Sequence, residues 1–175
     1  LGAHVIPKEF ANNRDQYVEL VKGKMLDACA PFAKWIDVFC DTGAFSVEEA
    51  REILTAGISR GLKGRIHGNQ LGDTGGAELA AELNLASVDH CTHISDKGID
   101  ALAQSGVVAT LLPGAEFFTK SMYPDVRRFI NAGVTVALAS DCNPGSSYIS
   151  SMPVIMSIAI REMHFTAAQA FYAAT

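Results

Sequence analysis

Short apolar stretches alternate along this chain with longer segments in which apolar positions recur every three or four residues. The short stretches are rich in Val, Ile and Leu and show little alternation of apolar and polar positions, which is typical of strands buried on both faces of a parallel sheet. The predicted strands are Ala3–Ile6, Ile36–Cys40, Gly64–His67, Ser87–His90, Val107–Leu112 and Val134–Ser140.

The longer segments predict helices. Ser46 with Glu49 forms a capping-box pattern that opens a helix to about Gly61, and Thr166 with Gln169 opens another near the end of the sequence. The other predicted helices are Asp15–Cys29, Gly75–Leu83, Asp96–Ser105, Pro124–Ala132 and Met152–Met163.

A succession of strand-then-helix units predicts a parallel α/β fold with right-handed connections. Two architectures satisfy this pattern: an open doubly wound sheet, and a TIM-like (β/α)8 barrel with about six of its eight units present. A complete barrel needs about 250 residues, and the 175 residues here fit about three quarters of one. We therefore expect residues 1–175 to be one partial catalytic barrel, cut from a longer protein.

Composition and charge limit the class of function. Hydrophobic residues make up 49% of the chain and charged residues 19%, as in ordinary globular domains. The formal net charge is −5 and no basic cluster is present, so neither nucleic acid nor a membrane surface is an expected partner. Without a signal peptide pattern, we expect a cytoplasmic protein whose four cysteines are reduced and buried.

Polar side chains with ligating or catalytic chemistry stand at the ends of successive predicted strands. They are His4, Asp41, His67 followed by Asn69 and Gln70, Asp89 with His90, and Asp141. A single histidine at a strand end is more often a hydrogen-bonded core residue than a ligand. In a barrel, however, the carboxyl ends of the strands form the active-site face, so a series of such residues indicates one shared site.

These residue types suit metal-dependent hydrolysis. A catalytic metal site uses neutral imidazole and carboxylate ligands and keeps one position for water, which the ion activates. His67 and Asp141 are suitable ligands, and His90 is suitable to move the proton. Because a catalytic zinc site has about three protein ligands, this pair is incomplete.

The loop after the last predicted strand has a tight-turn signature. Pro144 fixes its own φ, and Gly145 accepts a positive φ. The backbone N–H groups of Gly145, Ser146 and Ser147 are candidates for an anion-binding nest that suits a substrate carboxylate. The alternative is a plain structural turn.

These residues resemble the second half of the amidohydrolase superfamily pattern. In that pattern, histidines end the fifth and sixth barrel strands and an aspartate ends the eighth, so residues 1–175 would correspond to strands three to eight. The first strand, which carries a His-x-His metal pair, would be missing. Within the superfamily, the sequence resembles the imidazolonepropionase family in Leu1–Phe10, Asp37–Cys40, Ile66–Leu71, Ser87–His90, Leu111–Ala115 and Ala139–Ser146.

The resemblance implies catalytic roles for four residues. His67 and Asp141 would hold one divalent metal ion, zinc or iron. His90 would orient or deprotonate the attacking water, and Asp141 or His90 would pass a proton to the ring nitrogen. Gln70 would contact the imidazolone ring; some family members carry Glu there, which leaves a general-base role at this position open.

The resemblance also implies the substrate and its contacts. The reaction would be hydrolysis of the cyclic amide of 4-imidazolone-5-propanoate to N-formimidoyl-L-glutamate in histidine degradation. His4 and Gln70 would bind this small molecule, and Asn143, Gly145 and Ser146 would hold its carboxylate-bearing part. We expect a homodimer for the full-length protein and an inactive, poorly stable segment on its own. The alternatives are another amidohydrolase, such as a guanine-type deaminase, and a doubly wound ligand-binding domain without catalysis.

Three further residues carry weaker expectations. Glu116, after the fifth predicted strand, either reaches the mouth of the barrel or is a solvated loop acid. Asp89 is expected to face away from the site, because it precedes His90 in a strand. Trp35 is expected to pack helices on the barrel.

Overall fold

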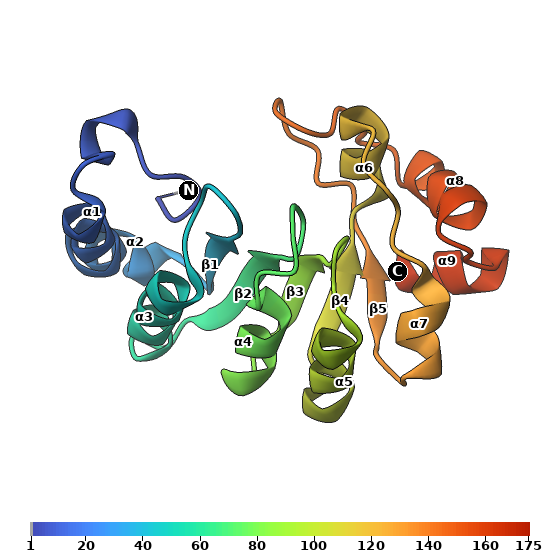
Figure 1. Cartoon of the computed structure of the whole chain (residues 1–175), viewed down its shortest axis with the longest axis horizontal. Coiled ribbons are helices and arrows are strands. Elements are labelled where there is room, and N and C mark those ends of the chain that lie inside the picture. Colours follow the sequence, from blue (N-terminus) through green and yellow to red (C-terminus); the bar gives the residue numbers. More distant parts are fainter. Residues whose placement is uncertain (1) are drawn as a thin grey trace.

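Parallel strands that follow one another in sequence also lie side by side in space. A computed structural model describes residues 2–175 and contains a five-stranded sheet in the order β1-β2-β3-β4-β5 (Figure 1). The strands are β1 (Trp35–Cys40), β2 (Lys63–Gly68), β3 (Ser87–His90), β4 (Val108–Leu111) and β5 (Val136–Leu138). A doubly wound sheet reverses its strand order at a switch point, whereas this order has no reversal, as in a barrel. The doubly wound alternative is therefore wrong.

Helices connect the strands and cover one side of the sheet. They are α1 (Arg14–Leu20), α2 (Leu26–Cys29), α3 (Val47–Ile58), α4 (Gly76–Glu82), α5 (Asp96–Ser105), α6 (Pro113–Thr119), α7 (Val126–Asn131), α8 (Met152–Glu162) and α9 (Ala167–Ala173). A wider π-type turn over Val21–Met25 joins α1 to α2, and short 3-10 turns span Lys8–Phe10 and Ala30–Phe32. None of the described helices is long and apolar enough to cross a membrane.

Both predicted capping boxes are confirmed. Ser46 Oγ accepts a hydrogen bond from Glu49 N at 3.2 Å, and Glu49 Oε2 accepts one from Ser46 N at 2.8 Å. Thr166 and Gln169 make the same reciprocal pair at the start of α9. These bonds satisfy N–H groups that have no partner within the helix, which fixes where α3 and α9 begin.

The two faces of the sheet differ in polarity. In β1, Ile36, Val38 and Cys40 are buried under the helices, while the alternate residues Trp35 and Asp37 are exposed. The side chains of Lys63 and Arg65 lie over the Trp35 ring on this second face. The prediction that Trp35 packs against the helices is therefore wrong, because the two-residue period of a strand puts it opposite Ile36.

The first predicted strand is not a strand in the structure. Ala3–Ile6 forms a turn and an irregular stretch, joined to β1 by a hydrogen bond from Phe39 N to Ala3 O at 2.9 Å. Pro7, which follows directly, has no N–H to donate to a ladder. The structure also forms α6 where a loop was expected, because Pro113 suits the first turn of a helix.

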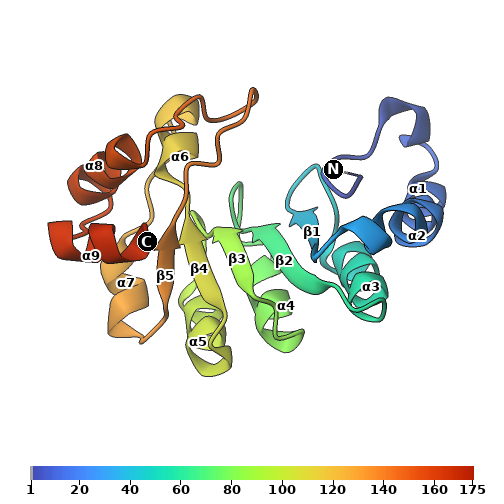
Figure 2. The same ribbon diagram turned by 180° about the vertical axis from the view of Figure 1, so that it is seen from behind.

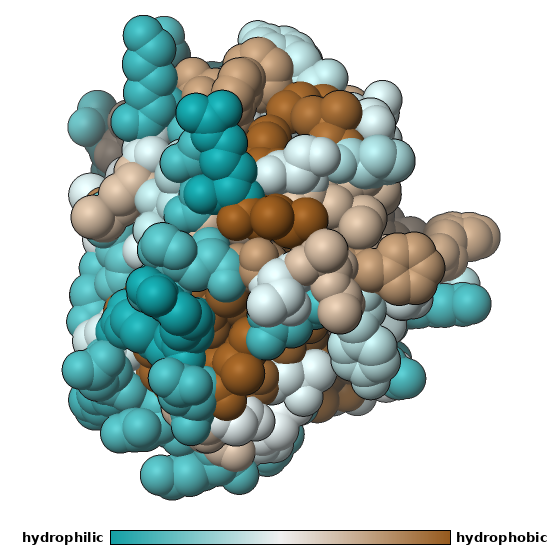
Figure 3. Space-filling model, turned by 90° about the vertical axis from the view of Figure 1, so that its right-hand side faces the viewer, coloured by the Kyte–Doolittle hydropathy of each residue, from teal (hydrophilic) through white to brown (hydrophobic). Residues whose placement is uncertain are grey.

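The four cysteines are free thiols, as expected. Cys40 and Cys91 are buried, but Cys29 and Cys142 are exposed, so the expectation of burial is wrong for these two. Seen from the side of α7, α8 and α9, apolar side chains also reach the surface between hydrophilic ones (Figure 3). The exposed large apolar residues of α8 and α9 are Val154, Ile160, Phe171 and Tyr172.

The loops that follow the strands gather at one edge of the sheet. Both ribbon views show the loop after β5 and helix α6 rising from this edge, with α3, α4 and α5 on the opposite side (Figures 1 and 2). Parallel strands put all their carboxyl ends at the same edge. The polar residues at the strand ends therefore all lie near the carboxyl edge of the sheet.

Candidate active site

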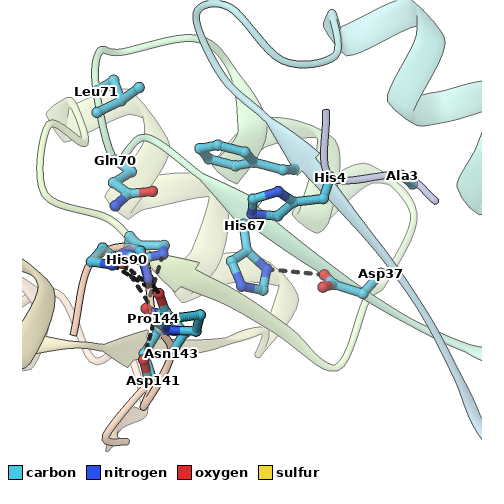
Figure 4. Close-up of a pocket in the computed structure, with 13 residues that line it drawn as sticks. Ala3, His4, Asp37, His67, Gln70, Leu71, His90, Asp141, Asn143 and Pro144 are labelled. Carbon is cyan, nitrogen blue, oxygen red and sulfur yellow. Dashed lines mark hydrogen bonds and ion pairs between the residues drawn. The ribbon is translucent and has the colours of Figure 1, made fainter. Parts of the chain in front are cut away.

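A cavity of about 670 Å³ opens at the carboxyl ends of the strands. Its wall contains these residues expected from the sequence: His4, His67, Gln70, His90, Asp141, Asn143, Gly145 and Ser146. Figure 4 shows side chains pointing toward a common space from the N-terminal segment, β2 and the loop after it, β3, and the loop after β5. They are those of His4, His67, Gln70, His90, Asp141 and Asn143. His67, His90 and Asp141 thus line the same cavity.

His67 is held by a carboxylate from the neighbouring strand. Its Nδ1 lies 3.1 Å from Asp37 Oδ1 (Figure 4). Asp89 Oδ2 is 3.9 Å from the same nitrogen. A carboxylate only accepts hydrogen bonds, so Nδ1 carries the proton and Nε2 keeps its lone pair. Burial lowers the pKa of His67, but the hydrogen bond and charge of Asp37, with the charges of Asp89 and Asp141, raise it overall.

His90 ends β3 in a left-handed backbone conformation. Its φ is 80° and that of Cys91 is 57°, a costly region for residues with a side chain. The ring centroid lies 5.4 Å from that of His67, and Nε2 is 4.0 Å from Asp141 Oδ2. Burial, helped by the nearby His67, lowers the pKa of His90 to about 3. At neutral pH this imidazole is therefore uncharged, with one ring nitrogen able to accept a hydrogen bond.

Asp141 reaches the cavity from the loop after β5, also with a positive φ, of 47°. Burial raises its pKa above the ordinary range, and the charge of Asp89 acts in the same direction against the attraction of His67. Asn143 Nδ2 donates to Asp141 O at 2.6 Å and so fixes the backbone that carries this carboxylate. Asp89 and Asp141 thus both lie near His67.

The loop from Asn143 to Ser147 is closed on itself. Asn143 Oδ1 accepts hydrogen bonds from Gly145 N at 2.7 Å and Ser146 N at 2.8 Å, and Asn143 N donates to Ser147 O at 2.8 Å. Two of the three N–H groups expected to form an anion-binding nest are already bonded, so that prediction is wrong for Gly145 and Ser146. An asparagine side chain competes well for the N–H groups of its own turn.

Gln70 is positioned by a buried aspartate. Asp41 Oδ2 accepts hydrogen bonds from Gln70 N at 2.7 Å and Leu71 N at 3.0 Å, and its other oxygen accepts one from Thr42 N. Asn69 is fully buried and accepts a hydrogen bond from Ala77 N at 3.0 Å. Asp41 and Asn69, which the sequence placed at strand ends, therefore hold the loop rather than line the cavity.

Three acidic residues differ from what the sequence indicated. Asp37 was not singled out, because its strand looked apolar throughout; the alternation of exposed and buried positions in β1 is the signal that identifies it. Asp89 was expected to face away from the site; its Oδ2 lies 3.9 Å from His67 Nδ1, but Asp89 is not part of the wall of this cavity. Glu116 is buried, with 3% of its surface exposed, so it is not a solvated loop acid.

The candidate metal ligands, His67 and Asp141, are suitable in type but few. His67 Nε2 and the Asp141 carboxylate are the kinds of donor that bind zinc or iron. Among residues 2–175, however, no group of three or more His, Cys, Asp or Glu side chains is arranged to hold a metal ion.

Comparison with known proteins identifies the relatives of this chain. No family model matches it. Curated imidazolonepropionases match over all of its residues, at 60% identity for the protein of Mycolicibacterium smegmatis and 58% for that of Streptomyces coelicolor. The chain is a relative of the imidazolonepropionases. It spans 44% and 45% of the length of these two proteins.

Solved structures similar to this imidazolonepropionase relative are amidohydrolase barrels. Guanine deaminase from C. acetobutylicum with bound guanine superposes with a TM-score of 0.70, over 97% of this chain and 48% of its own, at 17% identity. An amidohydrolase from a Sargasso Sea sample gives 0.64, over 99% and 44%, at 16% identity. At such low identity the likeness shows the fold alone, that of a partial (β/α)8 barrel.

Proposed function

We propose that the protein is an imidazolonepropionase, which hydrolyses the cyclic amide of 4-imidazolone-5-propanoate to N-formimidoyl-L-glutamate. The observation that carries the proposal is the identity of 54–60% with curated imidazolonepropionases along the whole chain. The cavity supports it, because the residues that the resemblance assigns to catalysis and substrate binding all line one wall.

We place one divalent metal ion, zinc or iron, on His67 and Asp141, with further ligands beyond those that residues 2–175 provide. The structure supports this at His67, where the bond to Asp37 orients the ring and leaves Nε2 free. When bound, such an ion activates water and polarises a carbonyl group. The acidic surroundings formed by Asp37, Asp89 and Asp141 suit a cation at this position.

The chain's own residues supply the proton transfers and the substrate contacts. We assign His90 to orient or deprotonate the attacking water, and His90 or Asp141 to pass a proton to the ring nitrogen as the C–N bond breaks. The Gln70 amide has both a donor and an acceptor for the imidazolone ring.

The rest of the cavity wall holds the substrate. His4 stacks on Phe39 with ring centroids 5.3 Å apart and closes the cavity on the side of β1. Asn143, Gly145 and Ser146 close it on the side of the loop after β5, where we place the carboxylate-bearing chain. We also place the enzyme in the cytoplasm, which the free thiols support; a homodimer stays a prediction.

Turnover of 4-imidazolone-5-propanoate by the natural, metal-loaded protein tests the proposal, with guanine as the competing substrate. We expect loss of the imidazolone absorbance and no release of ammonia from guanine. His90→Ala should lower kcat about 10²-fold to 10⁴-fold. His93→Ala is the matched control, because this neighbouring histidine is not part of the cavity wall. Deamination of guanine without hydrolysis of the imidazolone would assign the protein to the alternative reaction.

A further inference from the structure

A buried acid on α6 is bonded to the turn that carries His90. Thr92 Oγ1 donates to Glu116 Oε1 at 2.6 Å, and the two residues are 5% and 3% exposed. The other carboxyl oxygen, Oε2, is buried without a partner among the described residues. Burial raises the pKa of Glu116 to about 7, with the charge of Asp141 adding to the rise. Burying a carboxyl group with one oxygen unpaired destabilises the fold, so a role for Glu116 other than stability is expected.

The ring of His90 is not oriented by hydrogen bonds of its own. Within residues 2–175 its Nδ1 is buried without a partner, and its Nε2 is 4.0 Å from Asp141 Oδ2, beyond hydrogen-bond distance. The direction of the ring is instead set by the backbone, through positive φ values at His90 and Cys91. A conformation of this kind persists only where its surroundings enforce it.

Several contacts enforce this turn, and one of them comes from a side chain of another element. Cys91 N donates to Gly68 O at 3.2 Å and His93 N to Asn69 O at 2.7 Å, which tie the turn to β2. The Thr92–Glu116 bond ties it to α6, on the side of β4. Thr92 is two residues from His90, so releasing this bond lets the turn rotate about its remaining anchors.

Helix α6 also packs against the loop that carries Asp141. A Cβ atom on Gly114 would lie 2.5 Å from Ser147 Oγ and 3.3 Å from Ser140 O. Ser147 Oγ in turn donates to Ser140 O at 2.9 Å, directly before Asp141. One short helix therefore contacts the turn of His90 and the loop of Asp141.

We propose that Glu116, acting through Thr92, is a positioning residue that sets the orientation of His90 toward Asp141 in the reaction cavity. The role of His90 as a proton carrier rests on the proposed function. The claim that Glu116 orients the His90 ring does not depend on that function. Glu116 itself is not part of the cavity wall, so it acts through the turn rather than on the substrate.

Removing the pair together tests the proposal without leaving a buried group unpaired. In the natural, metal-loaded protein, Thr92→Val with Glu116→Leu should lower kcat about tenfold to 10²-fold while KM changes less than about threefold. The melting temperature should not fall, because two buried polar groups are replaced by apolar ones of similar shape. Glu116→Gln keeps an acceptor for Thr92 and should restore kcat to within about twofold of wild type.

A matched control is the pair Glu78→Gln and Glu78→Leu. Glu78 Oε2 is also buried without a partner among the described residues, but this glutamate lies on α4, outside the cavity wall. Neither change should alter kcat by more than about twofold. A fall as large as that of the Thr92–Glu116 double variant would show that buried glutamates act through general packing, and would overturn the proposal.

A crystal structure of the double variant separates this proposal from the proposed function. We expect the His90 ring to rotate or shift relative to Asp141, changing the 4.0 Å separation of Nε2 and Oδ2. An unmoved ring overturns the positioning role, whatever the activity, and so does a moved ring with unchanged kcat. If the wild-type protein does not hydrolyse the imidazolone, the proposed function is wrong. The position of the His90 ring in the double variant then decides by itself whether Glu116 orients His90.

Discussion

Asp37 Oδ1 lies 3.1 Å from His67 Nδ1, across the gap between the neighbouring strands β1 and β2. This bond fixes the His67 tautomer and ring direction, so that Nε2 presents its lone pair to the cavity. An imidazole held in this way loses less freedom on binding a metal ion than one that rotates. The Asp37 carboxylate also makes the ring nitrogen more basic.

We therefore expect Asp37→Ala to weaken metal binding by about tenfold to 10²-fold. The measurement is a competition titration of the natural protein with a metal chelator. Asp100→Ala is the control, because Asp100 is an exposed acid on α5. Equal metal affinity in the two variants would show that Asp37 does not act on the ligand, whether or not activity changes.

The sequence predicted the cavity wall because the site depends on strand ends, which local patterns mark well. His67 and His90 lie at the ends of β2 and β3 and Asp141 follows β5, and parallel strands bring such positions to one edge. The same patterns predicted the starts of α3 and α9, where Ser46 and Thr166 act within one turn. Features that depend on residues close together in the chain, such as strand ends and capping boxes, can be predicted from the sequence alone.

What the sequence could not predict depends on contacts between distant segments. Asp37 meets His67 across 30 positions, and Thr92 meets Glu116 across 24, so no local pattern indicates either pair. At the turn of Asn143 the sequence instead predicted a binding feature that the structure does not form. Its residues suited an anion-binding nest, but the nearest acceptor for Gly145 N and Ser146 N is the Asn143 side chain itself.

Glu116 should make the stability of the protein depend on pH in a defined direction. Burial raises its pKa from 4.5 to about 7 in the folded state, so the folded protein binds this proton more tightly than the unfolded chain. Stability is therefore lost as the pH rises from about 4.5 to about 7, and the loss is complete above that range. A shift of this size corresponds to about 3 kcal/mol.

Glu116→Gln removes this titration and keeps an acceptor for Thr92. We expect the variant to be more stable than the wild type at pH 8, by up to about 3 kcal/mol, and nearly equal to it at pH 4.5. Urea unfolding at the two pH values measures the difference. A difference that does not change with pH would show that the Glu116 carboxyl titrates normally in the folded protein.

The pH profile of catalysis should lack an acid limb from His90. Its pKa is lowered to about 3 by burial, with His67 contributing. The imidazole therefore stays uncharged between about pH 5 and 8, the range in which an ordinary histidine titrates. We expect a His90→Ala variant to lose activity by a similar factor at pH 5.5 and pH 8. A loss seen only at pH 8, with equal rates at pH 5.5, would mean that His90 is already protonated in the wild type near pH 6.

Residues 1–175 on their own should be poorly stable and should not hydrolyse the imidazolone. The second face of the sheet carries Trp35, Asp37 and Arg65 without cover from the described residues, and the outer edges of β1 and β5 lack a further strand in the sheet. Unpaired strand edges and exposed apolar surface, such as that of α8 and α9, favour association between chains. We expect the isolated segment to elute as aggregates in size-exclusion chromatography and to unfold without a cooperative transition. A soluble monomer with a sharp thermal transition would show that five strands suffice for a stable unit. The free energy lost by exposing the second face of the sheet would then be smaller than the free energy gained by burying the face under the helices.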